Sequence, residues 1–329
     1  DFVDLRSFIK TDAAFSPQAF IPGGIDMLTE PGGLPDAGKI LGLPWAFWTQ
    51  SFGYNDAVWE KAGINPPADN WTWDDFKQIA KKFTTDTNGD GQADTHGAVV
   101  LVNVNRLGMI LHNAGTFWFD RPILPLQSRL TDPKVLSVLD DLSQLYRQGV
   151  ITNDGKSYNT GATAMYAAIA PNALSQTLRD QGVIQKFMRS PHWPNGQTGS
   201  ELSVLSYSIL QSSQHPKEAW EWIKFLTLNK QNQLALVNDP QFARIPANLT
   251  AMQQYFKAKA EVEPTITKFM DEVVSPESYA RPEHPKLPQI TNVLQKSLEK
   301  ALLGAQSVSV KEAMLQANTQ IEPILAEYR

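Results

Sequence analysis

Oxygen-bearing side chains recur in the segment that begins at Asp86 with the spacing of a calcium-binding loop. They stand at positions 1, 3, 5 and 9 of an EF-hand-type loop, and Gly91 occupies position 6, where such a loop turns sharply. Position 12 is Gly97 instead of the usual glutamate, so other oxygens of the chain, or water, would have to complete the coordination shell. We predict a structural calcium ion here, and the alternative is a solvated turn without metal. The predicted ligands are Asp86, Asn88, Asp90, Asp94 and, through its backbone carbonyl, Gln92.

A second candidate segment, residues 41–63, combines aromatic rings with amide and hydroxyl groups. Trp45 and Trp48 stand close to Gln50 in this stretch. Aromatic faces beside hydrogen-bonding groups suit a ligand with apolar faces and a polar rim, such as a sugar ring. Because large aromatic side chains are mostly buried, the alternative is that Trp45 and Phe47 are ordinary core residues.

Further polar candidates follow a predicted strand. Residues 98–102 form a buried-strand run, and Asn103, Asn105 and Arg106 come directly after it. Ligands bind beyond the carboxyl ends of strands in open α/β sheets, so these three residues are candidate ligand contacts. The alternative is that they cap the helix that comes after them.

One more strand and one helix start can be read from local signals. Residues 200–209 alternate polar and apolar side chains, which makes Ser203 and Ser206 candidate hydroxyl contacts, unless they only form an exposed strand face. Thr72 and Asp75 have the spacing of a capping box, although the usual partner is glutamate or glutamine.

Two other helices have clear boundary or packing signals. Asp56 is predicted to cap a short helix that Gly63 ends. A helix starting at Pro216 has an apolar stripe that includes Trp222 and Ile223, so we predict that Trp222 lies in the core.

Length and composition limit the classes of function. The chain has 329 residues, which suits two domains, and its net charge of -5 argues against a nucleic-acid or anionic-membrane partner. Cysteine is absent, which excludes disulfides, thiolate metal sites and cysteine nucleophiles. No apolar run approaches the roughly 18 residues needed to cross a bilayer.

Several short motifs stand in a fixed order along the whole chain. They are Gly42-Leu-Pro-Trp45, Tyr54-Asn55-Asp56, Ala62-Gly63, Trp71-Thr-Trp-Asp-Asp-Phe76, His215-Pro-Lys-Glu-Ala-Trp220 and Ile245-Pro-Ala247. No single motif is diagnostic, but their order and spacing are, and they resemble the extracellular solute-binding proteins of carbohydrate ABC importers, family 1, which are similar to the maltose-binding protein.

The resemblance implies an α/β, periplasmic-binding-protein-like type II fold with two lobes, a ligand cleft and three lobe crossings. Lobe 1 would contain residues 1–48 and 208–275, and lobe 2 would contain 49–207 and 276–329. In the family, the segment matching Asp1 to Leu5 lies well inside the first lobe, so we expect lobe 1 to lack its N-terminal part here. A signal segment, absent from this chain, would direct the protein to the periplasm or to a lipid anchor at the cell surface.

The function implied is capture of a sugar or oligosaccharide in the interlobe cleft and delivery to the ABC transporter permease, without catalysis and as a monomer. The resemblance adds Asn172, at a predicted helix start, to the candidates above. The alternatives are a glycoside hydrolase, which needs two facing carboxylates, or a calcium-stabilised carbohydrate-binding or adhesion module. The predicted ligand-binding residues are Trp45, Trp48, Gln50, Asn105, Asn172, Ser203 and Ser206.

Overall fold

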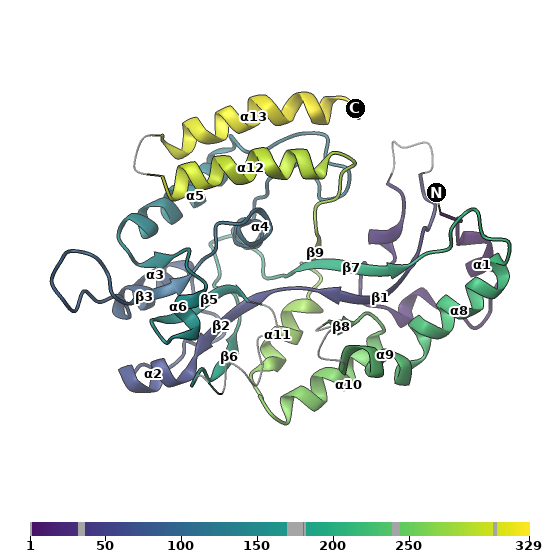
Figure 1. Cartoon of the computed structure of the whole chain (residues 1–329), viewed down its shortest axis with the longest axis horizontal. Helices are drawn as coiled ribbons and strands as arrows, with labels where there is room; N and C mark the ends of the chain where they lie inside the picture. Colours follow the sequence, from purple (N-terminus) through teal and green to yellow (C-terminus); the bar gives the residue numbers. More distant parts are fainter. Residues whose placement is uncertain (1, 32–36, 170–179, 181, 239–243, 305–307) are drawn as a thin grey trace. The chain divides into compact units, whose positions relative to one another are not determined.

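The chain folds as two units, each with its own strands and helices (Figure 1). Unit 1 contains Asp1–Thr49 and Leu202–Met270, and unit 2 contains Gln50–Glu201 and Asp271–Arg329. The chain therefore passes between the units three times, as the predicted fold requires. The computed structural model describes residues 2–31, 37–169, 180, 182–238, 244–304 and 308–329.

The predicted lobes differ from these units at Thr49 and over two short segments. Residues 202–207 belong to unit 1, because they form a strand that pairs with the strand ending at Trp48. Residues 271–275 belong to unit 2, where Glu272 accepts a hydrogen bond from Ser51. The sequence pattern identifies a strand but not the strand with which it pairs. The predicted lobe boundaries therefore lie a few residues away from the boundaries of the two units.

Unit 1 is built around an antiparallel strand pair. β1 (Leu43–Trp48) pairs with β7 (Glu201–Tyr207) and with the short strand β8 (Ile245–Pro246). Phe47, on β1, is fully buried, and α8 packs against this strand. The helices and 3-10 turns of unit 1 are α1 (Arg6–Thr11), η1 (Pro17–Ala19), η2 (Asp26–Leu28), α8 (Pro216–Leu228), α9 (Lys230–Asn238) and α10 (Leu249–Ala260).

Unit 2 contains a mixed sheet with the strand order β4-β3-β5-β2-β6. β3 runs parallel to β4 and β5, whereas β2 runs antiparallel to β5 and β6. The carboxyl ends of β3 and β5 therefore meet at one edge of the sheet, where the predicted polar candidates after residue 102 begin. The strands are β2 (Ser51–Asn55), β3 (His96–Val99), β4 (Ile151–Thr152), β5 (Thr163–Ile169) and β6 (Gln185–Met188).

Helices surround this sheet and complete the core of unit 2. α5, α12 and α13 pack side by side, and α4 packs against α12 and β5 (Figure 1). α11 (Ile266–Val273) carries the chain from unit 1 into unit 2, and β9 (Tyr279–Ala280) comes after it. The helices are α2 (Asp56–Ala62), α3 (Trp73–Lys82), α4 (Val104–Asn113), α5 (Pro133–Arg147), α6 (Lys156–Asn159), α12 (Leu287–Leu302) and α13 (Val310–Ala326). Nowhere in the part of the chain that the structure describes is a helix both long and apolar enough to cross a membrane.

The helix boundaries read from the sequence are confirmed with one exception. Thr72 and Asp75 form a complete capping box, and Gly63 ends α2 in the left-handed conformation at φ 65°. Asp56, predicted as an N-cap, is instead the first residue of α2, after Asn55. As the first helical residue it lies one position too late to be the N-cap, and its carboxylate forms an ion pair with Lys186 at 2.5 Å.

The prediction that Trp222 is a core residue was wrong. Its side chain is 59% exposed, and its neighbour Trp220 is only 3% exposed. Trp220 stacks on Phe8 with ring centroids 5.6 Å apart and donates a hydrogen bond to Asp12 at 2.9 Å. The buried face of α8 is thus set by α1 and the residues after it, which lie about two hundred residues earlier in the chain. The spacing of apolar residues within α8 does not reveal these partners.

Candidate ligand-binding site

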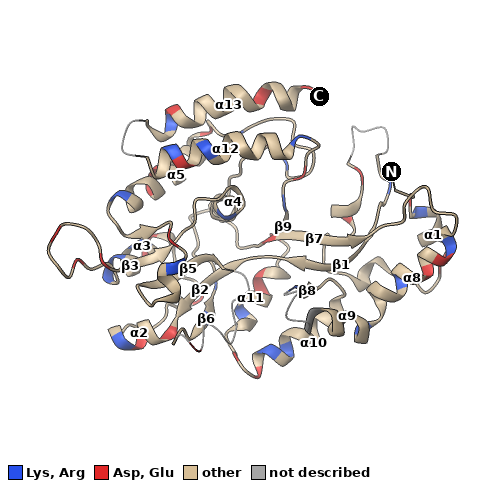
Figure 2. Cartoon of the chain, viewed as in Figure 1, with Lys and Arg blue, Asp and Glu red and all other residues tan. Residues whose placement is uncertain are grey.

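In unit 1, the predicted aromatic and hydroxyl residues lie on the paired strands β1 and β7. Trp48 is directly opposite Ser203, so their side chains share one face of the pair. Both residues are half-buried. Neither strand carries a charged side chain apart from Glu201, where β7 begins (Figure 2). This strand pair offers an indole face and a hydroxyl group side by side.

A pair of stacked aromatic rings lies toward the other end of the same two strands. Trp45 stacks on Tyr207 with ring centroids 5.7 Å apart and an angle of 26° between the rings. Both rings are half-buried, so the alternative that Trp45 is an ordinary core residue fits less well than it does for Phe47, which is fully buried. Ser206 is exposed, opposite Pro44. Tyr207 was not among the predicted site residues, although the alternating strand contained it.

In unit 2, the structure brings together two predicted residues from distant parts of the sequence. The Nε2 of Gln50 donates to the backbone carbonyl of Asn105 at 3.2 Å. Gln50 is fully buried, and its Oε1 has no hydrogen-bond partner among the described residues. The bond uses only the backbone of Asn105, whose side chain makes no hydrogen bond with a described residue. Asn103 fills the capping role instead, accepting from the amides of Asn105 and Arg106.

Arg106 links the start of α4 to a strained point of β5. Its Nη1 donates to the carbonyl of Ala168 at 2.6 Å, and its guanidinium lies over the Tyr166 ring at 5.4 Å. Ala168 has φ 59°, a left-handed conformation that costs a non-glycine residue about 1 kcal/mol. Strain of this kind is concentrated at functional sites. Tyr166 was missed by the sequence reasoning, because nothing in a buried-strand pattern singles out one ring.

Two buried carboxylates lie where the chain crosses between the units, and they differ in their surroundings. Glu272 accepts from the Ser51 hydroxyl at 2.5 Å and from the backbone amide and hydroxyl of Ser190. Burial raises the pKa of Glu272, and these donors oppose the rise. Neither carboxylate oxygen of Glu201 has a hydrogen-bond partner among the described residues.

The environment of Glu201 strongly favours its protonated form. Burial raises the pKa of Glu201 to about 8, with Arg281 acting against the rise and Glu283 adding to it. The hydroxyl of Tyr279 is also buried without a hydrogen-bond partner among the described residues. A neutral carboxylic acid carries a proton it can donate, whereas an ionised carboxylate can only accept.

The predicted calcium loop lies in unit 2 between α3 and β3, where Figure 2 shows a series of acidic positions. Asp86 accepts from the backbone amides of Gly89 and Gly91 at 2.7 and 2.8 Å, and Asp94 accepts from the amide of Thr87 at 2.7 Å. No three acidic, histidine or cysteine side chains of the described residues are grouped so that they could hold a metal ion. The loop carboxylates are nevertheless exposed and retain lone pairs, so the calcium ion stays a prediction.

The structure thus groups the predicted ligand residues into one set in each unit. Trp45, Trp48, Ser203 and Ser206 share the β1–β7 pair, and Gln50 and Asn105 meet at the start of α4. Asn172 lies outside the described residues. The signal that could have identified Arg106 and Tyr166 as partners is their shared position at the carboxyl edge of the sheet.

Two α/β units joined by three crossings define the class as a periplasmic-binding-protein-like fold of type II. The family model of the bacterial extracellular solute-binding proteins matches residues 2–233, and the chain belongs to this family. No curated protein sequence matches the chain.

Solved structures show the same fold at low sequence identity. An ABC substrate-binding protein from Listeria monocytogenes in complex with cycloalternan has a TM-score of 0.77 at 18% identity, covering 98% of this chain and 80% of that one. The cyclic alpha-maltosyl-1,6-maltose binding protein from Arthrobacter globiformis has a TM-score of 0.78 at 15% identity, with 99% and 80% covered. A solute-binding protein from Thermotoga lettingae bound with alpha-D-tagatose has 0.73 at 22% identity, with 98% and 80% covered.

Proposed function

We propose that this protein binds a sugar or oligosaccharide and delivers it to an ABC importer. Family membership supplies solute binding, and the structural neighbours bound to cycloalternan and tagatose support a carbohydrate as the solute. The binding place we propose is the interlobe cleft that the sequence resemblance implies. The ligand is released unchanged, because a solute-binding protein carries its solute without breaking a bond.

The observation that carries the proposal is the composition of the β1–β7 pair. The half-buried Trp48 lies beside Ser203, and the Trp45–Tyr207 stack lies on the same two strands. Sugars present C–H patches that pack on aromatic faces and hydroxyl groups that need hydrogen-bond partners nearby. We assign Trp48 to stacking and Ser203 to a hydroxyl contact.

The polar groups of unit 2 supply the hydrogen bonds in this proposal. The Asn105 side chain can both donate and accept, and Gln50 Oε1 is a buried acceptor that needs a donor. A buried polar atom without a partner costs about 1–3 kcal/mol, so a ligand hydroxyl that donates to Oε1 would recover free energy on binding. The Gln50 side chain is already held by its hydrogen bond to the Asn105 carbonyl, which reduces the entropy that Gln50 loses on binding.

A glycoside hydrolase needs two facing carboxylates, and four acidic side chains on α3, α5 and α8 have other contacts in the structure. Asp75 completes the α3 capping box, Asp74 pairs with Lys77 at 2.8 Å, and Glu221 pairs with Lys224 at 3.0 Å. Asp141 accepts from the Trp73 indole at 3.2 Å. These contacts favour structural roles, so we propose a non-catalytic protein.

The proposed location and transport partner follow from the family, and the proposed metal ion follows from the spacing of residues in the sequence. We propose that the protein acts outside the cytoplasm, in the periplasm or anchored at the cell surface, and that it docks on the permease subunits as a monomer. We further propose a structural calcium ion at the Asp86 loop, held by the residues predicted from its spacing.

A thermal-shift screen of sugars tests the function. Suitable probes are tagatose, maltose, mannobiose and cycloalternan, with chromatography of the sugar after each incubation. A binding protein gains melting temperature with a specific sugar by mass action, and that sugar is recovered intact. Hydrolysed product would identify an enzyme and contradict the proposal. A response to none of a wider panel of mono- and oligosaccharides would also contradict it.

A further inference from the structure

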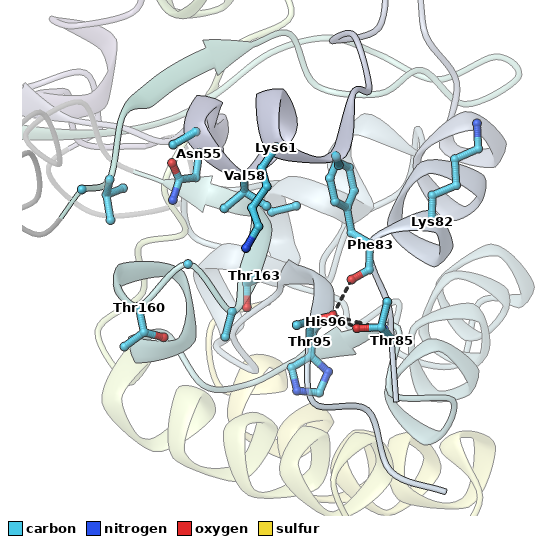
Figure 3. Close-up of a pocket in the computed structure, with 17 residues that line it drawn as sticks. Asn55, Val58, Lys61, Lys82, Phe83, Thr85, Thr95, His96, Thr160 and Thr163 are labelled. Atoms are coloured by element: carbon cyan, nitrogen blue, oxygen red, sulfur yellow. Dashed lines mark hydrogen bonds between the residues drawn. The ribbon is translucent and has the colours of Figure 1, made fainter. Parts of the chain in front are cut away.

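A pocket of about 510 Å³ lies within unit 2 (Figure 3). It is lined by α2, by the end of α3 and by the segments that lead into β3 and β5. His96 and Thr163 are the first residues of these two parallel strands, so the pocket lies at their amino ends. Asn105 follows the carboxyl end of β3. The volume falls in the range of small-molecule sites, roughly 300–1,000 Å³.

The charged side chains among the described residues that line this pocket are lysines. They are Lys61 and Lys82, and none of the described lining residues is an aspartate or a glutamate. Lys61 directs its amine into the pocket, whereas Lys82 points away from it (Figure 3). The structure gives Lys61 no ion pair with a described residue. Nearby, by contrast, Lys186 is neutralised by Asp56 at 2.5 Å. Lys61 is therefore the charge that a ligand would meet.

The threonine hydroxyl groups of the pocket already donate hydrogen bonds to other groups of the protein. Thr95 donates to the Phe83 carbonyl at 2.8 Å and so accepts from Thr85, whose hydroxyl lies at 2.6 Å. Thr163 donates to the Ser157 hydroxyl at 2.6 Å, and Thr160 donates to the Ser157 carbonyl at 3.0 Å. These side chains can accept but not easily donate, which leaves the donors elsewhere in the lining.

An amide group of the lining supplies one such donor. The Oδ1 of Asn55 accepts from the backbone amide of Ile184 at 3.2 Å, so the Asn55 Nδ2 is left to donate. Asn55 precedes the first turn of α2, and Lys61 lies in its last turn. An ammonium group and an amide N–H that line the same pocket favour an oxyanion.

Apolar side chains form another part of the lining. Val58, Phe83 and Val183 line the pocket, and Phe83 and Val183 are buried at 7% and 1% exposure. A free inorganic ion would leave this surface in contact with water. A ligand that carries both an acid group and a short hydrocarbon part would cover it.

We propose that this pocket binds a small amphiphilic anion, with its carboxylate or phosphate group at Lys61 and Asn55 and its apolar part against Val58 and Phe83. The site is independent of the proposed sugar function, because it lies at the opposite ends of the same strands. Both acid groups share the same recognition chemistry, and the experiment separates them.

Calorimetric titration of the full chain with hexanoate and with hexyl phosphate tests the proposal, and hexanol serves as the uncharged match. We expect saturable binding of at least one anion and no more than weak binding of hexanol. Lys61→Met removes a charge-assisted hydrogen bond, so it should weaken anion binding about tenfold or more. Lys81→Met is the matched control: Lys81 is exposed on α3 and is not among the lining residues, so its loss should leave the affinity unchanged.

Two further readouts place the ligand. In amide NMR spectra, the anion should move the resonances of residues 160–164 and 95–96, and Ala62→Phe, an exposed position on the pocket wall, should block binding by filling the space. Sugar affinity should be the same in Lys61→Met and in the wild type. Failure of both anions to bind saturably, equal anion affinity of Lys61→Met and wild type, or equal binding of hexanol would each overturn the proposal.

Discussion

The candidate sugar-binding residues form one set in each unit, and the two sets present different kinds of side chain. The set in unit 1, on β1 and β7, consists of indole and phenol rings with serine hydroxyls, and none of its members titrates near neutral pH. The set in unit 2 contains a buried amide, an asparagine and the Arg106–Tyr166 pair, and the buried Glu201 belongs to the same unit. Rings act through contact area, whereas the polar groups act through a small number of directed bonds.

The two sets of residues should therefore respond differently to amino-acid substitution. Substitutions in unit 1 should alter affinity by a similar amount at every pH, because no charge is involved. Changes in unit 2 should differ from one residue to the next, because some of its polar groups are buried without partners, some cap helices and one titrates.

The largest effect should come from Glu201. Its pKa is raised in the folded state to about 8, above its value in the unfolded chain, so the folded protein holds the proton more tightly. Stability from this group is therefore fully present below the unfolded pKa and is lost as pH rises toward 8. The loss is on the order of 4 kcal/mol, at 1.36 kcal/mol for each pKa unit.

Glu201→Gln replaces the protonated acid by a neutral amide of the same shape. We expect equal stability of the two proteins near pH 5 and higher stability of the variant near pH 8, measured by urea unfolding across the pH range. Ser203→Ala, on the same strand in unit 1, is the control and should show no pH-dependent difference from the wild type. A difference between Glu201→Gln and wild type that is the same at both pH values would contradict the buried-acid assignment.

Trp48→Ala should cause the largest loss of sugar affinity, because it removes a half-buried ring face from β1. We expect about 2 kcal/mol, which corresponds to roughly thirtyfold weaker binding, with little change between pH 5 and pH 8. Calorimetric titration at the two pH values measures both quantities. Trp222→Ala, which removes an exposed ring on α8, should leave the affinity unchanged. Equal losses in the two tryptophan variants would mean that the β1–β7 pair does not contact the sugar.

Asn105→Ala and Asn103→Ala separate binding from helix capping in unit 2. Asn103 caps α4, so its loss should lower stability by about 1 kcal/mol. The Asn105 side chain caps nothing, so its loss should leave stability unchanged and weaken sugar binding by about 1 kcal/mol, roughly fivefold. Thermal unfolding measures the stability of both variants, and calorimetric titration measures their sugar affinity. The assignment of Asn105 to the ligand fails if its removal lowers stability but leaves affinity intact.

Calcium should produce the smallest effect. With an incomplete set of ligands we expect weak affinity, so calcium at a few times its Kd would stabilise the protein by less than about 1 kcal/mol. EDTA should lower the melting temperature and added calcium should restore it, whereas magnesium at the same concentration should not. Asp90→Asn should reduce the response. No change in melting temperature with calcium or EDTA would remove the calcium assignment.

Local features were accessible from the sequence, and distant partnerships were not. The Thr72–Asp75 box and the end of α2 at Gly63 depend on neighbours a few residues away, and both were predicted. The burial of Trp220 in place of Trp222 depends on Phe8, far away in the sequence. The side-chain pattern alone could not choose between the two tryptophans.

The candidate site shows the same limit. Gln50 and Asn105 were each predicted as ligand contacts from strand position and chemistry, but their mutual hydrogen bond joins residues far apart in the chain. The bond from Arg106 to Ala168 depends on a left-handed backbone at an alanine, a conformation that the residue type itself disfavours. Such strain is set by tertiary packing, so it is visible only in the structure.

The most direct test is calorimetric titration of the wild-type chain with the sugar that gives the largest thermal shift, followed by chromatography of the sugar recovered from the cell. We predict saturable binding with one sugar per chain, with all of the sugar recovered unaltered. Cleavage of the sugar, or heat of dilution alone with every carbohydrate tried, would contradict it.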